Sequence, residues 1–203
     1  MTIDGATIPE FLVATFRDPR AAARRLIGLQ LDSGMLWQAF LLVAVLSVMT
    51  NLVFQMLLGT VDAPPDPRLP ALLQDPILLG YIQACLLVLA IFAVHWVGRL
   101  CGGTGPFEGA IIIVTWLQFV LLVLSFAQVI AAFALPPLVE IIALVGPILG
   151  FWLLSQFVCA LHGFESGWTV FVGTIVAMFG LVFALAIGLT LISVLFGLEI
   201  GNV

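Results

Sequence analysis

This chain of 203 residues carries little charge, and that shortage excludes most classes of soluble protein. It contains no lysine, six arginines, eleven acidic residues and two histidines, so that 8% of its residues are charged while 63% are hydrophobic. No water-soluble domain could cover its surface with so few polar groups. Cysteine is also scarce. Three residues without paired spacing, Cys85, Cys101 and Cys159, argue against a disulfide framework and against a zinc site.

Motifs that carry chemistry are missing as well. No nucleophile stands beside a base, and the glycine-rich segment 101–106 lacks the lysine of a phosphate-binding loop, so we expect it to be a flexible turn. His95 and His162 could ligate haem or a metal, but no acidic or thiol cluster joins them, and hydrogen-bonding histidines near helix ends are commoner. We therefore predict no enzymatic activity, no cofactor, no metal and no nucleic-acid partner.

Long apolar runs are what the chain does contain. Five of them each supply the roughly 20 apolar residues that a helix needs to cross a hydrocarbon layer about 30 Å thick. The sequence predicts an all-α integral membrane protein whose single five-helix domain occupies residues 36–203. The predicted spans are residues 36–58, 77–97, 108–135, 138–161 and 168–198. Prolines mark the starts of the second, third and fourth spans.

Residues 1–35 are predicted to form an amphipathic, basic helical arm on the cytoplasmic side. Thr7 and Glu10 have the spacing of a capping box, and Asp18-Pro19 begins a second short helix. Its arginines are candidates for binding lipid headgroups of an anionic leaflet, with packing against the span ends as the equal alternative. They are Arg17, Arg20, Arg24 and Arg25.

The distribution of arginine also predicts the orientation. With five spans, the arm and Arg99 put five arginines on one side of the membrane, whereas Arg68 lies alone on the other. Cytoplasmic segments are enriched in arginine and lysine. We therefore predict a cytoplasmic N-terminus and an outward C-terminus.

Two sets of residues within the spans could form contacts or a path. Small residues repeat along one side of the fifth span and favour close packing with a helix of this chain or of another protein. They are Gly173, Ala177, Gly180, Ala184 and Gly188. Amides in the first, third and fourth spans could line a polar path for a small solute, although such residues more often join helices. They are Asn51, Gln55, Gln118, Gln128 and Gln156.

Four short motifs, taken in order, resemble bacterial members of the Yip (Ypt/Rab-interacting protein) family. They are Arg17 to Ala22, His95 to Arg99 followed by Gly102, Gly103 and Phe107, Trp116 to Gln118, and Leu161 to Ser166. The resemblance implies five transmembrane helices, a cytoplasmic N-terminus and an outward C-terminus. Eukaryotic relatives are linked to Rab-type GTPases and vesicle traffic, but their longer cytosolic region has no counterpart here. The absence of lysine, with arginine as the basic residue used and alanine favoured, is typical of a GC-rich bacterium and therefore of its inner membrane.

Two functional hypotheses follow. The first is a non-enzymatic scaffold or accessory protein that binds membrane-protein partners, or a second copy of itself, or shapes the bilayer through the basic arm and the small-residue face. The alternative is a carrier of a small solute or lipid along the polar path.

Overall fold

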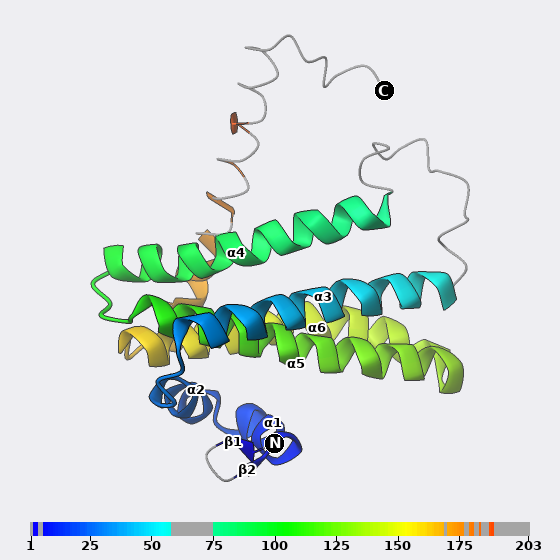
Figure 1. Ribbon diagram of the computed structural model, residues 1–203, viewed down its shortest axis with the longest axis horizontal. Coiled ribbons are helices and arrows are strands. Elements are labelled where there is room, and N and C mark those ends of the chain that lie inside the picture. Colours follow the sequence, from blue (N-terminus) through cyan, green and yellow to red (C-terminus); the bar gives the residue numbers. More distant parts are fainter. Residues whose placement is uncertain are drawn as a thin grey trace.

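Four long helices run side by side and alternate in direction (Figure 1). They are α3 (Ser33–Leu57), α4 (Pro76–Leu100), α5 (Phe107–Ala134) and α6 (Pro136–His162). The computed structural model describes residues 2–3, 6–57, 75–168, 170–176, 179–180, 183 and 187–188. All four helices are long and apolar enough to cross a membrane. Four of the five predicted spans are thus confirmed as helices, and most of the fifth, 168–198, lies outside the described residues.

Helix boundaries follow the capping signals of the sequence more closely than the ends of the apolar runs. The Asp75 carboxylate accepts a hydrogen bond from Ile77 N–H at 2.9 Å, and Pro76 begins α4 as predicted. α3 begins at Ser33, before the predicted residue 36, because the Asp32 carboxylate accepts a bond from Gly34 N–H at 2.9 Å. A cap can start a helix in polar sequence that hydropathy alone omits.

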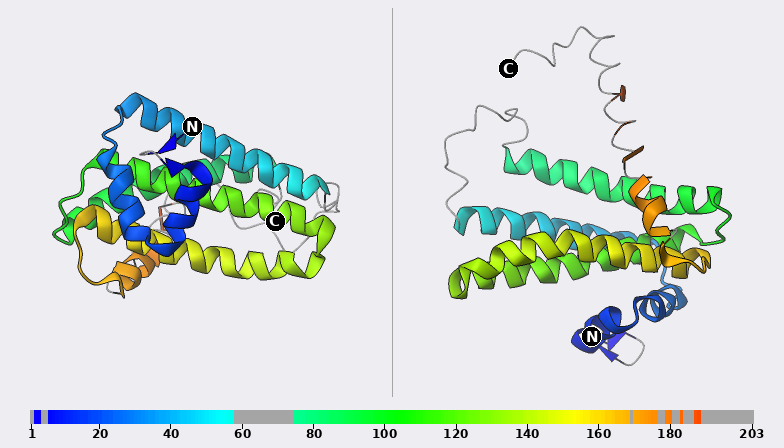
Figure 2. Two further views of the ribbon diagram at one scale, coloured as in Figure 1. Left: turned by 90° about the horizontal axis from the view of Figure 1, so that it is seen from below. Right: turned by 180° about the vertical axis from the view of Figure 1, so that it is seen from behind.

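Three of the long helices, α3, α5 and α6, form one layer, and α4 lies against one side of it. α5 lies between α3 and α6 and is the most buried of the four, while α4 packs chiefly on α5 (Figures 1 and 2). The core around α5 includes Ile111, Ile113 and Val120 together with Leu153 and Phe157 of α6, each no more than 2% exposed. In contrast, many large apolar side chains on the outer faces are exposed, as expected of a surface that meets lipid.

The N-terminal arm lies on the opposite side of this layer from α4. It contains β1 (Thr2–Ile3), β2 (Ala6–Thr7), α1 (Ile8–Arg17) and α2 (Pro19–Gly28). The two-residue strands, which pair antiparallel, were not predicted. α1 and α2 run across the long helices instead of along them (Figure 2, left). They lie near the end at which α3 and α5 begin and α4 and α6 end.

We call this end the arginine-rich end, because Arg99 and the four arginines of the arm gather there. The predicted caps of the arm are present: Thr7 N–H donates to Glu10 Oε2 at 2.8 Å, and Ala21 N–H donates to Asp18 Oδ1 at 2.9 Å. Each short helix therefore begins where its side-chain cap is placed.

Candidate functional site

His162 ends α6 and joins three parts of the chain at the arginine-rich end. Its side chain is 4% exposed. Gly105 N–H donates to Nδ1 at 3.2 Å, and Nε2 lies 3.0 Å from the Val94 carbonyl oxygen in α4. Because Nδ1 accepts a hydrogen bond, the imidazole is the neutral tautomer whose Nε2–H donates to Val94. Both ring nitrogens are occupied, so His162 has no lone pair left for a metal or haem.

Three glycines make room for this imidazole. A Cβ atom built on Gly98 or Gly103 would overlap the ring, and one on Gly105 would lie 3.0 Å from its Cε1 and 2.6 Å from Leu161 Cγ. Gly103 and Gly105 are buried. The segment that we expected to be a flexible turn is therefore packed against His162, and glycine is needed there for close approach.

The last turn of α6 holds the histidine in place. Gly163 has φ 75°, and the N–H groups of Gly163 and Phe164 both donate to the Cys159 carbonyl oxygen. A left-handed glycine with these bonds is a common way for a helix to end. It turns the chain so that the Phe164 ring stacks on the imidazole, with centroids 5.6 Å apart.

The arm docks on α5 through a second buried polar contact. Thr15 is fully buried; its hydroxyl donates to the Phe11 carbonyl oxygen at 2.8 Å and accepts a bond from Trp116 Nε1–H at 3.1 Å. The Phe11 ring meets the Trp116 indole edge-on at 5.0 Å. The indole N–H of α5 thus finds its partner in α1, which fixes the arm on the bundle.

Arg20 ties α2 to α6 and to the segment after it. Its Nε donates to Gln156 Oε1 at 2.7 Å, and its Nη1 donates to the Glu165 carbonyl oxygen at 3.2 Å. The other three arginines of the arm, Arg17, Arg24 and Arg25, are exposed. The predicted headgroup set is therefore divided into one arginine engaged in the fold and three that face outward.

The motifs that suggested a family thus meet at one end of the molecule, and the comparisons agree with that resemblance. The model of the Yip1 domain matches residues 13–195. The chain belongs to the Yip1 domain family. Comparison with curated proteins and with solved structures gives no match. This Yip1-domain protein is an integral membrane protein, as its family and its four apolar helices show together.

The amides considered for a polar path in this Yip1-domain protein lie in separate contacts. Gln118 donates to Ser47 at 3.0 Å between α5 and α3, and Asn51 donates to Gln83 at 3.4 Å between α3 and α4. Gln128 donates to the Val139 carbonyl oxygen at 3.5 Å, and Gln156 accepts from Arg20. Gln55 lines a pocket of about 210 Å³ with Asn51 and Gln83.

The small-residue face has open space beside it where it is described. A Cβ atom on Gly173, Gly180 or Gly188 would meet nothing within 4 Å. Ala177 and Ala184 lie outside the residues whose side chains are described. Among the described residues these three glycines therefore have no close packing partner, and an intermolecular role for this face stays a prediction.

Sequence reasoning missed the partnership between His162 and its glycines. It did identify both parts, as a histidine near a helix end and as a glycine-rich loop, but gave no reason to place them together. The buried Nδ1 of His95 and the buried hydroxyl of Thr115 have no hydrogen-bond partner among the described residues. Over these residues, no group of three His, Cys, Asp or Glu side chains could hold a metal ion.

Proposed function

We propose that this Yip1-domain protein is a non-enzymatic accessory protein of a bacterial inner membrane, with its N-terminus in the cytoplasm. It presents the outward face of the arm to membrane-protein partners and to the lipid headgroups beside them. The observation that carries the proposal is that some side chains of the arm bind the bundle and others are exposed. Thr15 and Arg20 hold it to the bundle, while its other three arginines and the side chains of Val13 and Phe16 are exposed.

The orientation of the arm supports this role. Helices that run across the spans extend along the plane of a membrane, where an apolar and basic face can meet the interface. Each arginine near an anionic surface contributes about 1 kcal/mol of attraction. Because the arm is fixed to α5 and α6, its exposed face has a single orientation before a partner binds. This pre-organisation lowers the entropic cost of binding.

The geometry favours this proposal over the carrier. A continuous polar path would need all five amides to share a cavity, whereas Asn51 and Gln55 line one small pocket and the other three lie in separate contacts. Hydrogen bonds of this kind commonly hold membrane helices together.

Affinity purification from native membranes tests the proposal. The variant Arg17→Ala/Arg24→Ala/Arg25→Ala should lose partners that co-purify in constant proportion with the wild type, while its thermal stability stays unchanged because these side chains are exposed. Arg99→Ala is the matched control, since Arg99 is an exposed arginine at the same end but on α4. Equal recovery of partners by the triple variant, or no reproducible partner for the wild type, would contradict the proposal.

The orientation has its own test. Reporter fusions within residues 59–74 and after Val203 should both give an external signal, while a fusion at the N-terminus should give a cytoplasmic one. A cytoplasmic signal from either of the first two would overturn the proposed topology.

The small-residue face is a second proposed contact with a partner or a second copy. Gly180→Leu should leave the stability of the isolated chain unchanged, because a Cβ there meets no atom of the described residues within 4 Å, and should weaken self-association or partner recovery. Unchanged association would remove this face from the proposal.

A further inference from the structure

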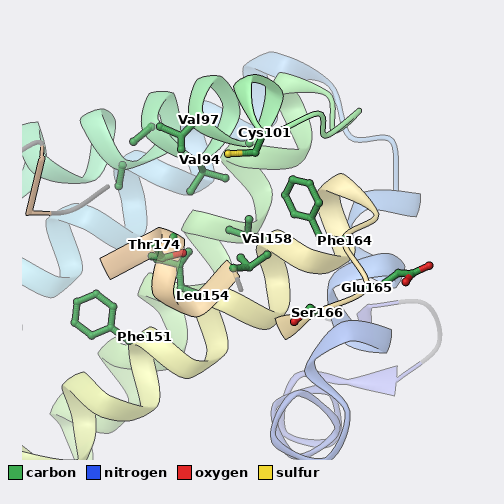
Figure 3. A pocket seen from close by; sticks show the side chains of 15 residues that line it. Val94, Val97, Cys101, Phe151, Leu154, Val158, Phe164, Glu165, Ser166 and Thr174 are labelled. Carbon is green, nitrogen blue, oxygen red and sulfur yellow. The ribbon is translucent and has the colours of Figure 1, made fainter. Parts of the chain in front are cut away.

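A large apolar cavity lies between α4, α6 and residues 164–166 and 170–174 (Figure 3). Its volume is about 540 Å³. Small-molecule sites commonly have volumes of about 300 to 1,000 Å³, so the cavity is large enough for a ligand. It adjoins the His162 contacts, because Val94, Gly98 and Phe164 touch both the cavity and the imidazole.

The walls of the cavity are hydrocarbon. Val94 and Val97 of α4 face Leu154 and Val158 of α6 across it (Figure 3). Water needs two to four polar partners to stay in a buried space, and apolar cavities of this kind remain dry. Since α4 and α6 are two of the apolar helices that can cross a membrane, the surrounding medium is bilayer hydrocarbon. The cavity is therefore matched to a hydrocarbon chain.

The two ends of the cavity differ. Cys101, Phe164, Glu165 and Ser166 lie at the arginine-rich end, and the Glu165 side chain points away from the cavity there (Figure 3). Arg20 is not among the lining residues, and its guanidinium is bonded to Gln156 and to the Glu165 carbonyl oxygen, so Glu165 supplies the charge at this end of the cavity. Phe151 and Thr174 lie at the other end, nearer the middle of the long helices. An occupant with a hydrocarbon tail and an ammonium group in its head would therefore meet apolar walls along the tail and a carboxylate near the head.

We propose that this cavity binds one acyl chain of a bilayer phospholipid, with the headgroup at the Glu165 end and the tail between α4 and α6. The tail occupies the space between the lining side chains of α4 and α6. The ammonium group of a zwitterionic headgroup then lies near the Glu165 carboxylate. This binding does not depend on the proposed partner function, since the exposed arginines of the arm take no part in it.

Native mass spectrometry of the full chain in detergent, with 1-palmitoyl-2-oleoyl-phosphatidylethanolamine added, tests the proposal. A zwitterionic lipid is the appropriate probe because it bears no net charge to attract the exposed arginines. Ala93 lines the cavity on α4, so Ala93→Phe should fill it and lower the one-lipid species at least fivefold. Ala143→Phe on α6 is the matched control; Ala143 is exposed and outside the cavity, and its variant should retain lipid like the wild type.

A second variant and a second measurement guard against misfolding. Ala90→Phe fills the same cavity one helical turn away. Added lipid should raise the unfolding temperature of the wild type and of Ala143→Phe, and should not raise that of either cavity-filled variant, because only a ligand that binds the folded state stabilises it. Equal lipid retention by all four proteins, or a co-purified apolar mass that phosphatidylethanolamine does not displace, would overturn the proposal.

Discussion

The packing of Gly98 against His162 makes a quantitative prediction. In Gly98→Ala the new methyl group would occupy the space of the imidazole ring, so the ring must move and its bonds to Gly105 and Val94 must break or lengthen. Each such bond is worth about 1 kcal/mol, and overpacking costs about 1 to 3 kcal/mol more. Alanine returns up to about 1 kcal/mol through its helix propensity. We expect a net loss of about 2 to 4 kcal/mol.

Thermal unfolding in detergent, followed by helical circular dichroism, measures this loss. For a chain of this size, 1 kcal/mol shifts the midpoint by about 2 to 4 °C, so Gly98→Ala should lower it by about 4 to 16 °C. Gly150→Ala is the matched control. Gly150 is also a buried glycine within a long helix, but its Cβ would meet Leu121 Cδ2 at 3.5 Å, an ordinary contact. That variant should unfold at the wild-type temperature or above it.

A double-mutant cycle identifies the cause. If the methyl group acts through the imidazole, Gly98→Ala should cost little in a His162→Ala background, giving a coupling energy close to its full cost in the wild type, about 2 to 4 kcal/mol. Additive losses would refute the reasoning, since the alanine would then disturb α4 without reference to the ring. A Gly98→Ala variant as stable as Gly150→Ala would refute it directly.

Three further predictions concern the arm. Thr15→Val should lower stability by about 1 to 3 kcal/mol and shift tryptophan emission, because Trp116 Nε1–H loses its buried acceptor. Arg20→Ala should expose the arm to limited proteolysis, whereas Arg24→Ala should not. The Thr7 backbone N–H holds the pKa of the Glu10 carboxyl below its ordinary value, so hydrogen-exchange protection of α1 should be present at neutral pH and lost as the pH falls through that lowered pKa.

Each of these has a control within the arm or beside it. Thr104→Val removes an exposed threonine hydroxyl and should change neither stability nor emission. Equal proteolysis of Arg20→Ala and Arg24→Ala would contradict the anchoring role of Arg20. In Glu10→Gln the acid dependence of α1 protection should disappear, and its persistence would assign that dependence to another group.

The membrane architecture could be predicted because it depends on short stretches of sequence. An apolar run long enough to cross hydrocarbon and an Asp-Pro pair at a helix start are local signals, and they located α4 to within a few residues. The start of α3 differed because the Asp32 cap acts on residues outside the apolar run. Such differences are small, since they move a boundary without changing which helices exist.

The candidate site could not be predicted in the same way, because its contacts join distant parts of the chain. Gly105 and His162 are 57 positions apart, and Arg20 and Gln156 are 136 positions apart. Arg20 and Arg24 are four positions apart on one helix and look alike in sequence. Arg20 is an anchor because Gln156 and Glu165, on other parts of the chain, lie within its reach. Arg24 is exposed.

This distinction determines what the family resemblance can say about activity. The motif residues Gly98, Gly103 and His162 pack against one another. Two further motif residues, Trp116 and Arg20, attach the arm to the bundle. Residues whose hydrogen-bonding groups and space are already used by the fold have little left for a ligand. A family resemblance that rests on such residues therefore indicates the fold and does not identify a ligand. The capacity to bind must reside in groups that the architecture leaves free, which are the outward arginines of the arm and the apolar cavity beside α4 and α6.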